Sequence, residues 1–164
     1  MQLNDLLRLN GTELDELYET ARTPELGELE GDYDGLLLEA QFPTLDRRYR
    51  IAGINRSWLP WKGKVFLQPS VDGGQGKNRF KTGSLKFRVW NFETCIAPSQ
   101  FGGSPACLVN YDIDGNSRLM RTTVFDEMKF LGDDLFLGKG GVRLFGRQPF
   151  VFYWAIGRPA TTAA

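Results

Sequence analysis

The stretch SLKFRVWNFETCI, residues 84–96, decides the fold class of this chain. Leu85, Phe87 and Val89 are apolar, and the residues between them are cations. This alternation is typical of a β-strand with one buried face. Beyond Trp90 the apolar positions change to the other face, as at Phe92. The change predicts either a β-bulge or a strand whose inner face becomes polar.

Further strands are predicted on both sides of this one. The last of them, 149–156, is apolar on both faces, so we expect it to be covered on both sides, with an N-terminal helix as one candidate cover. Turn residues separate the other apolar runs, and 107–121 resembles a hairpin around the turn at 114–116. The expected strands are 32–39, 64–68, 84–96, 106–112, 122–125, 128–131, 135–137, 142–145 and 149–156. They predict a mainly β protein, an antiparallel lipocalin-like barrel of about eight to ten strands.

Short helices are expected in the first part of the chain. Residues 12–21 place apolar side chains at helical spacing behind Thr12, which is a suitable N-cap. A second helix is predicted to start at Thr23 and Pro24, and a third to span 46–58. No repeat or linker divides the sequence, so 1–164 is expected to be one domain, with loose termini at 1–10 and 158–164.

The composition excludes several classes of function. The 164 residues include 20 basic and 20 acidic ones, and this zero net charge gives no electrostatic reason to expect a nucleic-acid or membrane partner. No apolar run is long enough to cross a bilayer. There is no histidine, which removes the usual general base, haem ligand and zinc ligand, so we expect no metal and no cofactor. The two cysteines, Cys95 and Cys107, are expected to be buried, inert and reduced, in a cytoplasmic protein.

Three motifs partly resemble ligand-binding loops. DIDGNS at 112–117 begins like a calcium loop, but Ser117 stands where the loop needs Gly and Thr123 where it needs Glu. A hairpin turn is the better interpretation. GGQGK at 73–77 and GKGG at 138–141 lack the spacing of a phosphate-binding loop, so both are predicted to be flexible turns.

A series of local motifs occurs in a recognisable order. GDYDG at 31–35 has the form G-x-aromatic-x-G, and WKGKVF follows at 61–66. NYD at 110–112, DEMK at 126–129, DDLFLG at 133–138 and PFVFY at 149–153 come after it. This order resembles the bacterial lipocalin-like family named for its GXWXG signature, over roughly 28–158. The resemblance implies a calycin-like barrel with an interior pocket more than it implies an activity.

The sequence departs from that family in two places. Tyr33 replaces the signature tryptophan, and the histidine expected near Asp126 is missing. Because related haem-binding barrels use a proximal histidine, haem binding is not supported. From the residues themselves, Tyr33 is expected to be a flat plug near one end of the barrel.

Candidate site residues are the polar and aromatic groups on the expected strands. The catalytic candidates are Tyr111, Asp126, Glu127 and Glu93, because an inward carboxylate beside a phenol can act as acid and base without a metal. The candidates for ligand contact are Trp61, Arg88, Trp90, Tyr111, Arg121, Phe152 and Trp154. The alternative is that the charged groups face outward or form structural ion pairs. Likewise, Trp58, Trp61, Lys62 and Lys64 can form a structural corner rather than a pocket mouth.

Three functions remain open. The first is binding of a small hydrophobic or amphipathic molecule in the barrel, with Arg88, Arg121 or Tyr111 at its polar end. The second is a cofactor-independent enzyme, such as an isomerase, cyclase or hydrolase, acting on a small hydrophobic substrate. The third is an interaction domain without a cavity. A homodimer is compatible with each of them.

Overall fold

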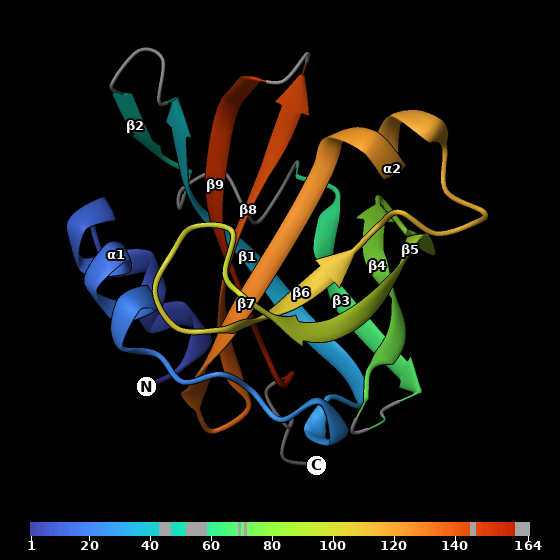
Figure 1. The fold of residues 1–164 in the computed structure, drawn as a ribbon, viewed down its shortest axis with the longest axis horizontal. Coiled ribbons are helices and arrows are strands. Elements are labelled where there is room, and N and C mark those ends of the chain that lie inside the picture. The colour runs from blue at the N-terminus through green and yellow to red at the C-terminus, as the bar shows by residue number, and fades with distance from the viewer. Residues whose placement is uncertain (43–46, 52–58, 69, 71, 145–146, 160–164) are drawn as a thin grey trace.

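The strands form one antiparallel sheet that closes on itself in the computed structural model (Figure 1), which describes residues 1–42, 47–51, 59–68, 70, 72–144 and 147–159. The strand order is β2-β1-β3-β4-β5-β6-β7-β8-β9, and β1 also pairs with β9. Eight strands therefore close a barrel and β2 extends beyond it, which confirms the predicted antiparallel barrel. The elements are η1 Leu3–Arg8, α1 Gly11–Thr20, η2 Leu26–Glu28, β1 Gly31–Phe42, β2 Arg47–Arg50, β3 Trp61–Gln68, β4 Gly74–Thr82, β5 Leu85–Ala97, β6 Ala106–Asn110, α2 Arg118–Thr123, β7 Val124–Gly132, β8 Leu135–Leu144 and β9 Arg147–Gly157.

The two ends of the barrel differ. We call the end that carries η2 the lower end, and the end that carries α2 and the β4–β5 turn the upper end (Figure 1). Leu26 and Leu29, at and beside η2, belong to the buried interior cluster and close the lower end. Tyr33 is fully buried above them, with its ring edge-on to Phe66 and Phe136. Tyr33 therefore has the plug position expected from its motif.

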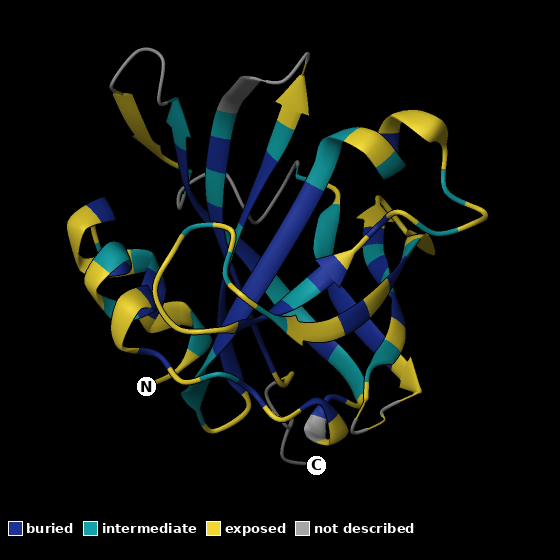
Figure 2. Cartoon of the chain, viewed as in Figure 1, coloured by how far each residue is buried: buried dark blue, intermediate teal, exposed yellow. Residues whose placement is uncertain are grey.

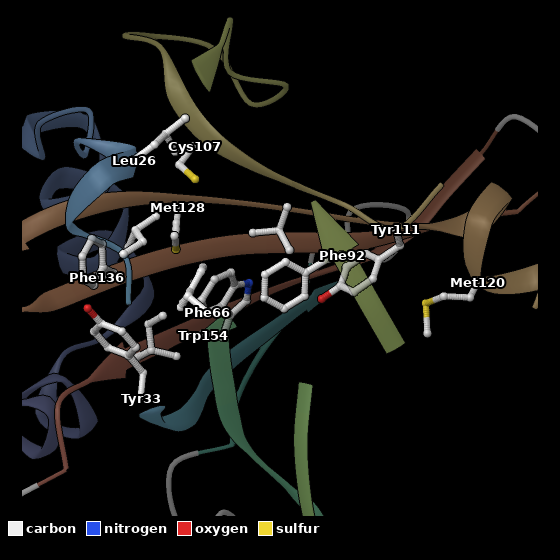
Figure 3. Close-up of a cluster of buried hydrophobic side chains, with 13 residues drawn as sticks. Leu26, Tyr33, Phe66, Phe92, Cys107, Tyr111, Met120, Met128, Phe136 and Trp154 are labelled. Atoms are coloured by element: carbon white, nitrogen blue, oxygen red, sulfur yellow. The ribbon is translucent and has the colours of Figure 1, made fainter. Parts of the chain in front are cut away.

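Aromatic and apolar side chains fill the barrel from the lower end to its middle. Figure 3 shows this cluster, in which Phe92 lies between Trp154 and Tyr111. Its buried members are Leu26, Leu29, Tyr33, Phe66, Phe92, Cys107, Val109, Tyr111, Met120, Met128, Phe136, Trp154 and Ile156. An eight-stranded barrel is narrow enough for side chains to fill it or to leave room for one small ligand.

A second apolar cluster lies outside the barrel, under η1 and α1. Leu6, Leu14 and Tyr18 from these helices meet the outer face of β1, β8 and β9, where Tyr153 and Ala155 are fully buried. Strand β9 is thus covered on both faces, as its sequence predicted. Helix α1 begins behind Asn10, whose side chain accepts hydrogen bonds from two backbone N–H groups, so Asn10 and not Thr12 is the cap.

A β-bulge at Trp90 explains the change of apolar face in β5. Lys77 pairs with Asn91 and Asn78 pairs with Val89, which leaves Trp90 as the extra residue, with a φ of 57°. The first half of β5 is exposed, whereas Phe92 beyond the bulge is fully buried (Figure 2). Of the two explanations that the sequence offered, the bulge is the one that the structure supports.

Several predicted elements differ from the structure. The helix expected over 46–58 is wrong for 47–50, which form β2, and its residues 52–58 lie outside the described part. Strand β4 begins at Gly74, inside the segment 73–77 that was predicted to be a flexible turn. The expected hairpin over 107–121 contains a loop and the start of α2, which Ser117 caps. The strands expected at 122–125 and 128–131 are one strand, β7, which begins at Val124 because Thr122 and Thr123 belong to α2. Those expected at 135–137 and 142–145 are likewise one strand, β8, as far as Leu144.

Candidate functional site

Four polar side chains meet inside the barrel, above the aromatic cluster. Lys64 comes from β3, Asn78 from β4 and Asp126 from β7, while Tyr111 follows the end of β6. All four residues are buried, and Lys64 is only 1% exposed. We call these four residues the interior polar cluster. Buried charges are rarely retained without a partner, and here each finds one in the other three.

The hydrogen bonds of the cluster converge on one amine and one phenol. Lys64 Nζ lies 3.0 Å from Asp126 Oδ2, 2.7 Å from the Tyr111 hydroxyl and 3.2 Å from Asn78 Oδ1. The Tyr111 hydroxyl also lies 2.8 Å from Asp126 Oδ2, to which it donates, and accepts from Asn78 Nδ2 at 3.0 Å. Trp61 Nε1 donates to Asn78 Oδ1 at 2.9 Å. An amine, a phenol and a carboxylate are therefore in direct contact.

Aromatic rings surround the Lys64 ammonium. Its Nζ lies 4.6 Å from the centre of the Trp154 ring system and 5.1 Å from that of Phe92. Tyr111 and Trp61 lie slightly farther away, at 5.4 and 5.9 Å. Ring faces attract a cation, so the cage favours a positive charge at this point of an otherwise apolar interior.

Burial changes the acid–base chemistry of the cluster. Loss of solvation lowers the pKa of the Lys64 amine, while the nearby Asp126 carboxylate opposes that change. Burial also raises the pKa of the Tyr111 hydroxyl well above its ordinary value, and the negative charge of Asp126 adds to this effect. Lys64 consequently gives up its proton more readily than an exposed lysine, whereas Tyr111 stays protonated.

Two buried polar atoms beside the cluster have no hydrogen-bond partner among the described residues. They are Asp126 Oδ1 and Trp154 Nε1. Both side chains lie against bare backbone of β8: a Cβ on Gly140 would come within 2.1 Å of Asp126 Oδ1, and one on Gly138 within 2.1 Å of Trp154 Cε2. One acceptor and one donor are thus left without a partner in the described part of the chain, which is costly for buried polar groups.

The segment at 138–141 is therefore neither a turn nor a phosphate-binding loop. It lies inside strand β8, which runs without interruption from Leu135 to Leu144. Its glycines leave the space that Asp126 and Trp154 occupy.

A pocket of about 310 Å³ lies beside α2. Tyr111 and Asp126 are among the residues that line it, together with Val109, Val124 and Arg121. Its size is at the lower end of the range for small-molecule sites. Two members of the cluster are therefore close to a space that opens toward the surface.

The structure brings together some of the predicted site residues. Tyr111 and Asp126 belong to the interior polar cluster, and Trp154 and Trp61 border it. Phe152, on β9, packs against the buried apolar cluster of the interior. Within this group, the candidates for ligand contact and for catalysis are neighbours.

The other predicted residues do not join the interior polar cluster. Arg88 pairs with Asp32, and Arg121 pairs with Asp112 and Asp114 on the surface, so neither arginine reaches the interior cluster. Glu93 is exposed on β5, and Trp90 is 46% exposed at the bulge, edge-on to the Phe80 ring.

Glu127 is buried on the outer face of β7. It accepts hydrogen bonds from the Tyr18 hydroxyl of α1, at 2.5 Å, and from the Gln100 backbone, at 2.7 Å. Its role is to hold α1 against the barrel, and it does not join Asp126 inside.

Lys64 and Asn78 are the site residues that the sequence reasoning missed. Lys64 was considered only for a pocket mouth, and Asn78 was not singled out. A usable signal is present, because Lys64 stands two residues before Phe66 and Asn78 two residues before Phe80, on the same strand faces. Each polar residue therefore shares the inward direction of a buried phenylalanine.

The two cysteines differ in exposure. Cys107 is buried, as expected, and burial raises the pKa of its thiol, whereas Cys95 is exposed, contrary to expectation. Among the described residues, no group of three or more histidine, cysteine or acidic side chains is placed to hold a metal ion. The loop at 112–117 caps α2 through Ser117.

Comparison with known proteins gives no identification. No protein-family model matches the sequence, and no curated protein matches it. In the part of the chain that the structure describes, no helix is both long enough and apolar enough to span a membrane.

Proposed function

We propose that this protein binds a small amphipathic molecule inside the upper half of its barrel. The observation that carries the proposal is the interior polar cluster, a charged and hydrogen-bonding group enclosed by an aromatic interior, beside one unpaired acceptor and one unpaired donor. A site of this composition suits a molecule with an apolar body and one polar end.

The apolar part of the site is the upper barrel. Leu37, Trp61, Val124 and Phe152 pack against the interior apolar cluster and are only partly buried, as is Phe130 beside Phe136 toward the lower end. We propose that the body of the ligand covers the first four of these side chains. Burial of apolar surface contributes about 25 cal/mol per Å², so even a small ligand gains appreciable affinity in this way.

The polar end of the ligand belongs at the interior polar cluster. A hydroxyl group there can donate to Asp126 Oδ1 and accept from Trp154 Nε1. A carboxylate or carbonyl oxygen can accept from Lys64 by replacing Asn78 Oδ1, which is the most distant of its three acceptors at 3.2 Å. Arg88 and Arg121, the arginines first considered for this role, are engaged by surface carboxylates. The resemblance to the GXWXG family fits the same proposal, since it implies an interior pocket.

Titration with amphipathic probes tests this function. A fluorescent fatty acid, a long-chain alcohol and a polycyclic dye are added to the protein, and binding is followed by probe emission and tryptophan quenching. We expect saturable binding of the acid and the alcohol, weakened by Lys64→Met for the acid. Arg88→Met removes an exposed cation and is the matched control that leaves binding unchanged. Absence of binding at high micromolar concentration contradicts the proposal.

A cofactor-independent enzyme is the second candidate. The observation that favours it is the hydrogen bond from Tyr111 to Asp126 at 2.8 Å, which places a phenol and a carboxylate at the proposed ligand position. Such a pair can move a proton at the carbon next to a carbonyl group. Exchange of that proton for deuterium in small enolisable ketones, followed by NMR, tests the activity. It should be lost in Asp126→Asn and in Tyr111→Phe, and exchange no faster than in buffer contradicts it.

A further inference from the structure

We infer that Lys64 condenses reversibly with the carbonyl group of an amphipathic aldehyde or ketone and holds it in the barrel as an imine. This inference rests on the proposed function, because the carbonyl compound must first occupy the upper barrel. It adds a covalent step and a substrate class to simple binding. Lysine amines form imines with carbonyl substrates, and they do so best where their surroundings favour the neutral amine.

The groups around Lys64 Nζ are the ones that imine formation needs. Asp126 Oδ2, at 3.0 Å, can accept the proton that the ammonium must lose before it attacks. The Tyr111 hydroxyl, at 2.7 Å, can relay a proton to the carbonyl oxygen. Asn78 holds the hydroxyl in place through Nδ2, at 3.0 Å. The three acceptors take up the three N–H donors of the ammonium, so the phenol and the carboxylate are both held against the amine before a carbonyl compound arrives.

The environment of Lys64 supports the first step. The lysine is buried in an apolar barrel, and the resulting loss of solvation lowers the pKa of its amine. An exposed lysine such as Lys86 on β5 has no comparable enclosure. At neutral pH the neutral amine is therefore more populated at Lys64 than on the surface.

Condensation of Lys64 with the carbonyl compound needs no further reactant. The Lys64 ammonium passes one proton to Asp126, and the neutral amine attacks the carbonyl carbon to form an N–C bond. Tyr111 relays a proton from that nitrogen to the carbonyl oxygen, which gives a carbinolamine. Asp126 then returns its proton to the hydroxyl group, which leaves as water while the nitrogen lone pair forms the C=N bond. One ammonium and one carbonyl compound become one protonated imine and one water.

The product fits the site as well as the reactant does. The protonated imine keeps the positive charge at the position of the ammonium, next to the Asp126 carboxylate and near the ring systems of Trp154 and Phe92. These contacts stabilise a cation whether it is an ammonium or an iminium. The carbon chain of the bound molecule would extend from Lys64 toward the partly exposed side chains of the upper barrel.

Reductive trapping tests the inference on the unmodified protein. Hexanal or benzaldehyde is incubated with the protein near neutral pH, cyanoborohydride is added, and peptides are mapped by mass spectrometry. We expect one main adduct at Lys64, heavier by the mass of the aldehyde less one oxygen atom. Labelling at Lys64 should exceed labelling at the exposed Lys86, because burial lowers the pKa of the Lys64 amine and favours its neutral form. Equal labelling of the two lysines, or an unlabelled Lys64, overturns the inference.

Variants separate this inference from the proposed function. Lys64→Arg should abolish the main adduct and Tyr111→Phe should slow its formation, whereas Lys86→Met should leave both unchanged. Non-covalent binding of the fluorescent alcohol is measured in parallel. If the alcohol binds and Lys64 is not trapped, the imine is wrong and the binding function stands. If neither occurs, both are wrong.

Discussion

Replacement of Asp126 by asparagine should strongly destabilise the barrel. Lys64 Nζ lies 3.0 Å from Asp126 Oδ2, and the two side chains are 1% and 6% exposed. Removal of one partner from such a buried pair leaves an uncompensated charge and costs about 3–5 kcal/mol. Since 1 kcal/mol shifts the melting temperature of a domain of this size by about 2–4 °C, the expected loss is roughly 6–20 °C.

A double-mutant cycle isolates the interaction. Lys64→Met alone should be destabilising, because it leaves the Asp126 carboxylate buried without its cation. The double variant Lys64→Met/Asp126→Leu removes both charges and should be more stable than either single variant. Asp112→Asn is the surface control: its partner Arg121 is 37% exposed, so the change should cost far less than Asp126→Asn.

Urea unfolding followed by tryptophan fluorescence and circular dichroism measures these differences, with the slope of the transition checked for each variant. The pH dependence gives a second test. In Asp126→Asn the attraction that raised the pKa of Lys64 is gone, so the folded-state pKa falls further below 10.5. Between the folded-state pKa of Lys64 and its unfolded value of 10.5, the unfolded chain binds more protons than the folded one. In that range the free energy of unfolding should rise with pH, by at most about 1.4 kcal/mol per pH unit. If Asp126→Asn costs no more than Asp112→Asn, or if the cycle is additive, the reasoning is refuted.

Three further predictions concern Gly140, Asp15 and the two cysteines. Gly140→Ala should cost about 1–3 kcal/mol and weaken ligand binding, because its Cβ would lie 2.1 Å from Asp126 Oδ1; unchanged unfolding and binding would contradict this. Burial tends to raise the pKa of Asp15, but a hydrogen bond from Tyr153 and nearby cations outweigh it and lower the pKa. Its stabilising effect is therefore present above about pH 4 and lost as the pH falls through the lowered value, and Asp15→Asn should flatten acid unfolding there. The buried thiol of Cys107 should react with a thiol reagent only after unfolding, whereas the exposed cysteine of β5 reacts at once.

The sequence predicts the barrel where its strands carry a regular pattern. The alternation before Trp90 and the two apolar faces of β9 are local features, so they are visible without the fold. Strand β4 was missed because only Phe80 among its nine residues is a large apolar side chain. Strand β2 was taken for part of a helix, although its exposed residues pair with the far end of β1.

The glycines of β8 show what local pattern cannot provide. Gly138 and Gly140 indicated a turn, because glycine is common in turns. They lie in a strand because Trp154 and Asp126 need the space beside the backbone, and these partners come from other strands. The reason for each glycine is therefore a contact between strands, which the sequence around the glycine does not contain.

The site was predicted in part for a similar reason. Tyr111 and Asp126 were chosen because they are a phenol and a carboxylate on apparent strands, and they do meet. Glu127 follows Asp126 directly, so it must point to the opposite face of β7. Which of the two faces inward depends on how β7 pairs with β6 and β8, and composition does not reveal that pairing.

The extra residue at Trp90 shifts the alternation of side chains in β5 by one residue. Odd-numbered positions face inward before the bulge, and even-numbered positions face inward after it. Val89 and Phe92 point to the same side of the sheet even though they are an odd number of residues apart, and only the insertion makes this possible. The number of residues in β5 therefore constrains the fold more tightly than the identity of the residue at position 90 does. A substitution at position 90 keeps both halves in place, whereas deletion of that single residue would force one half of the strand to turn its inner side chains toward solvent.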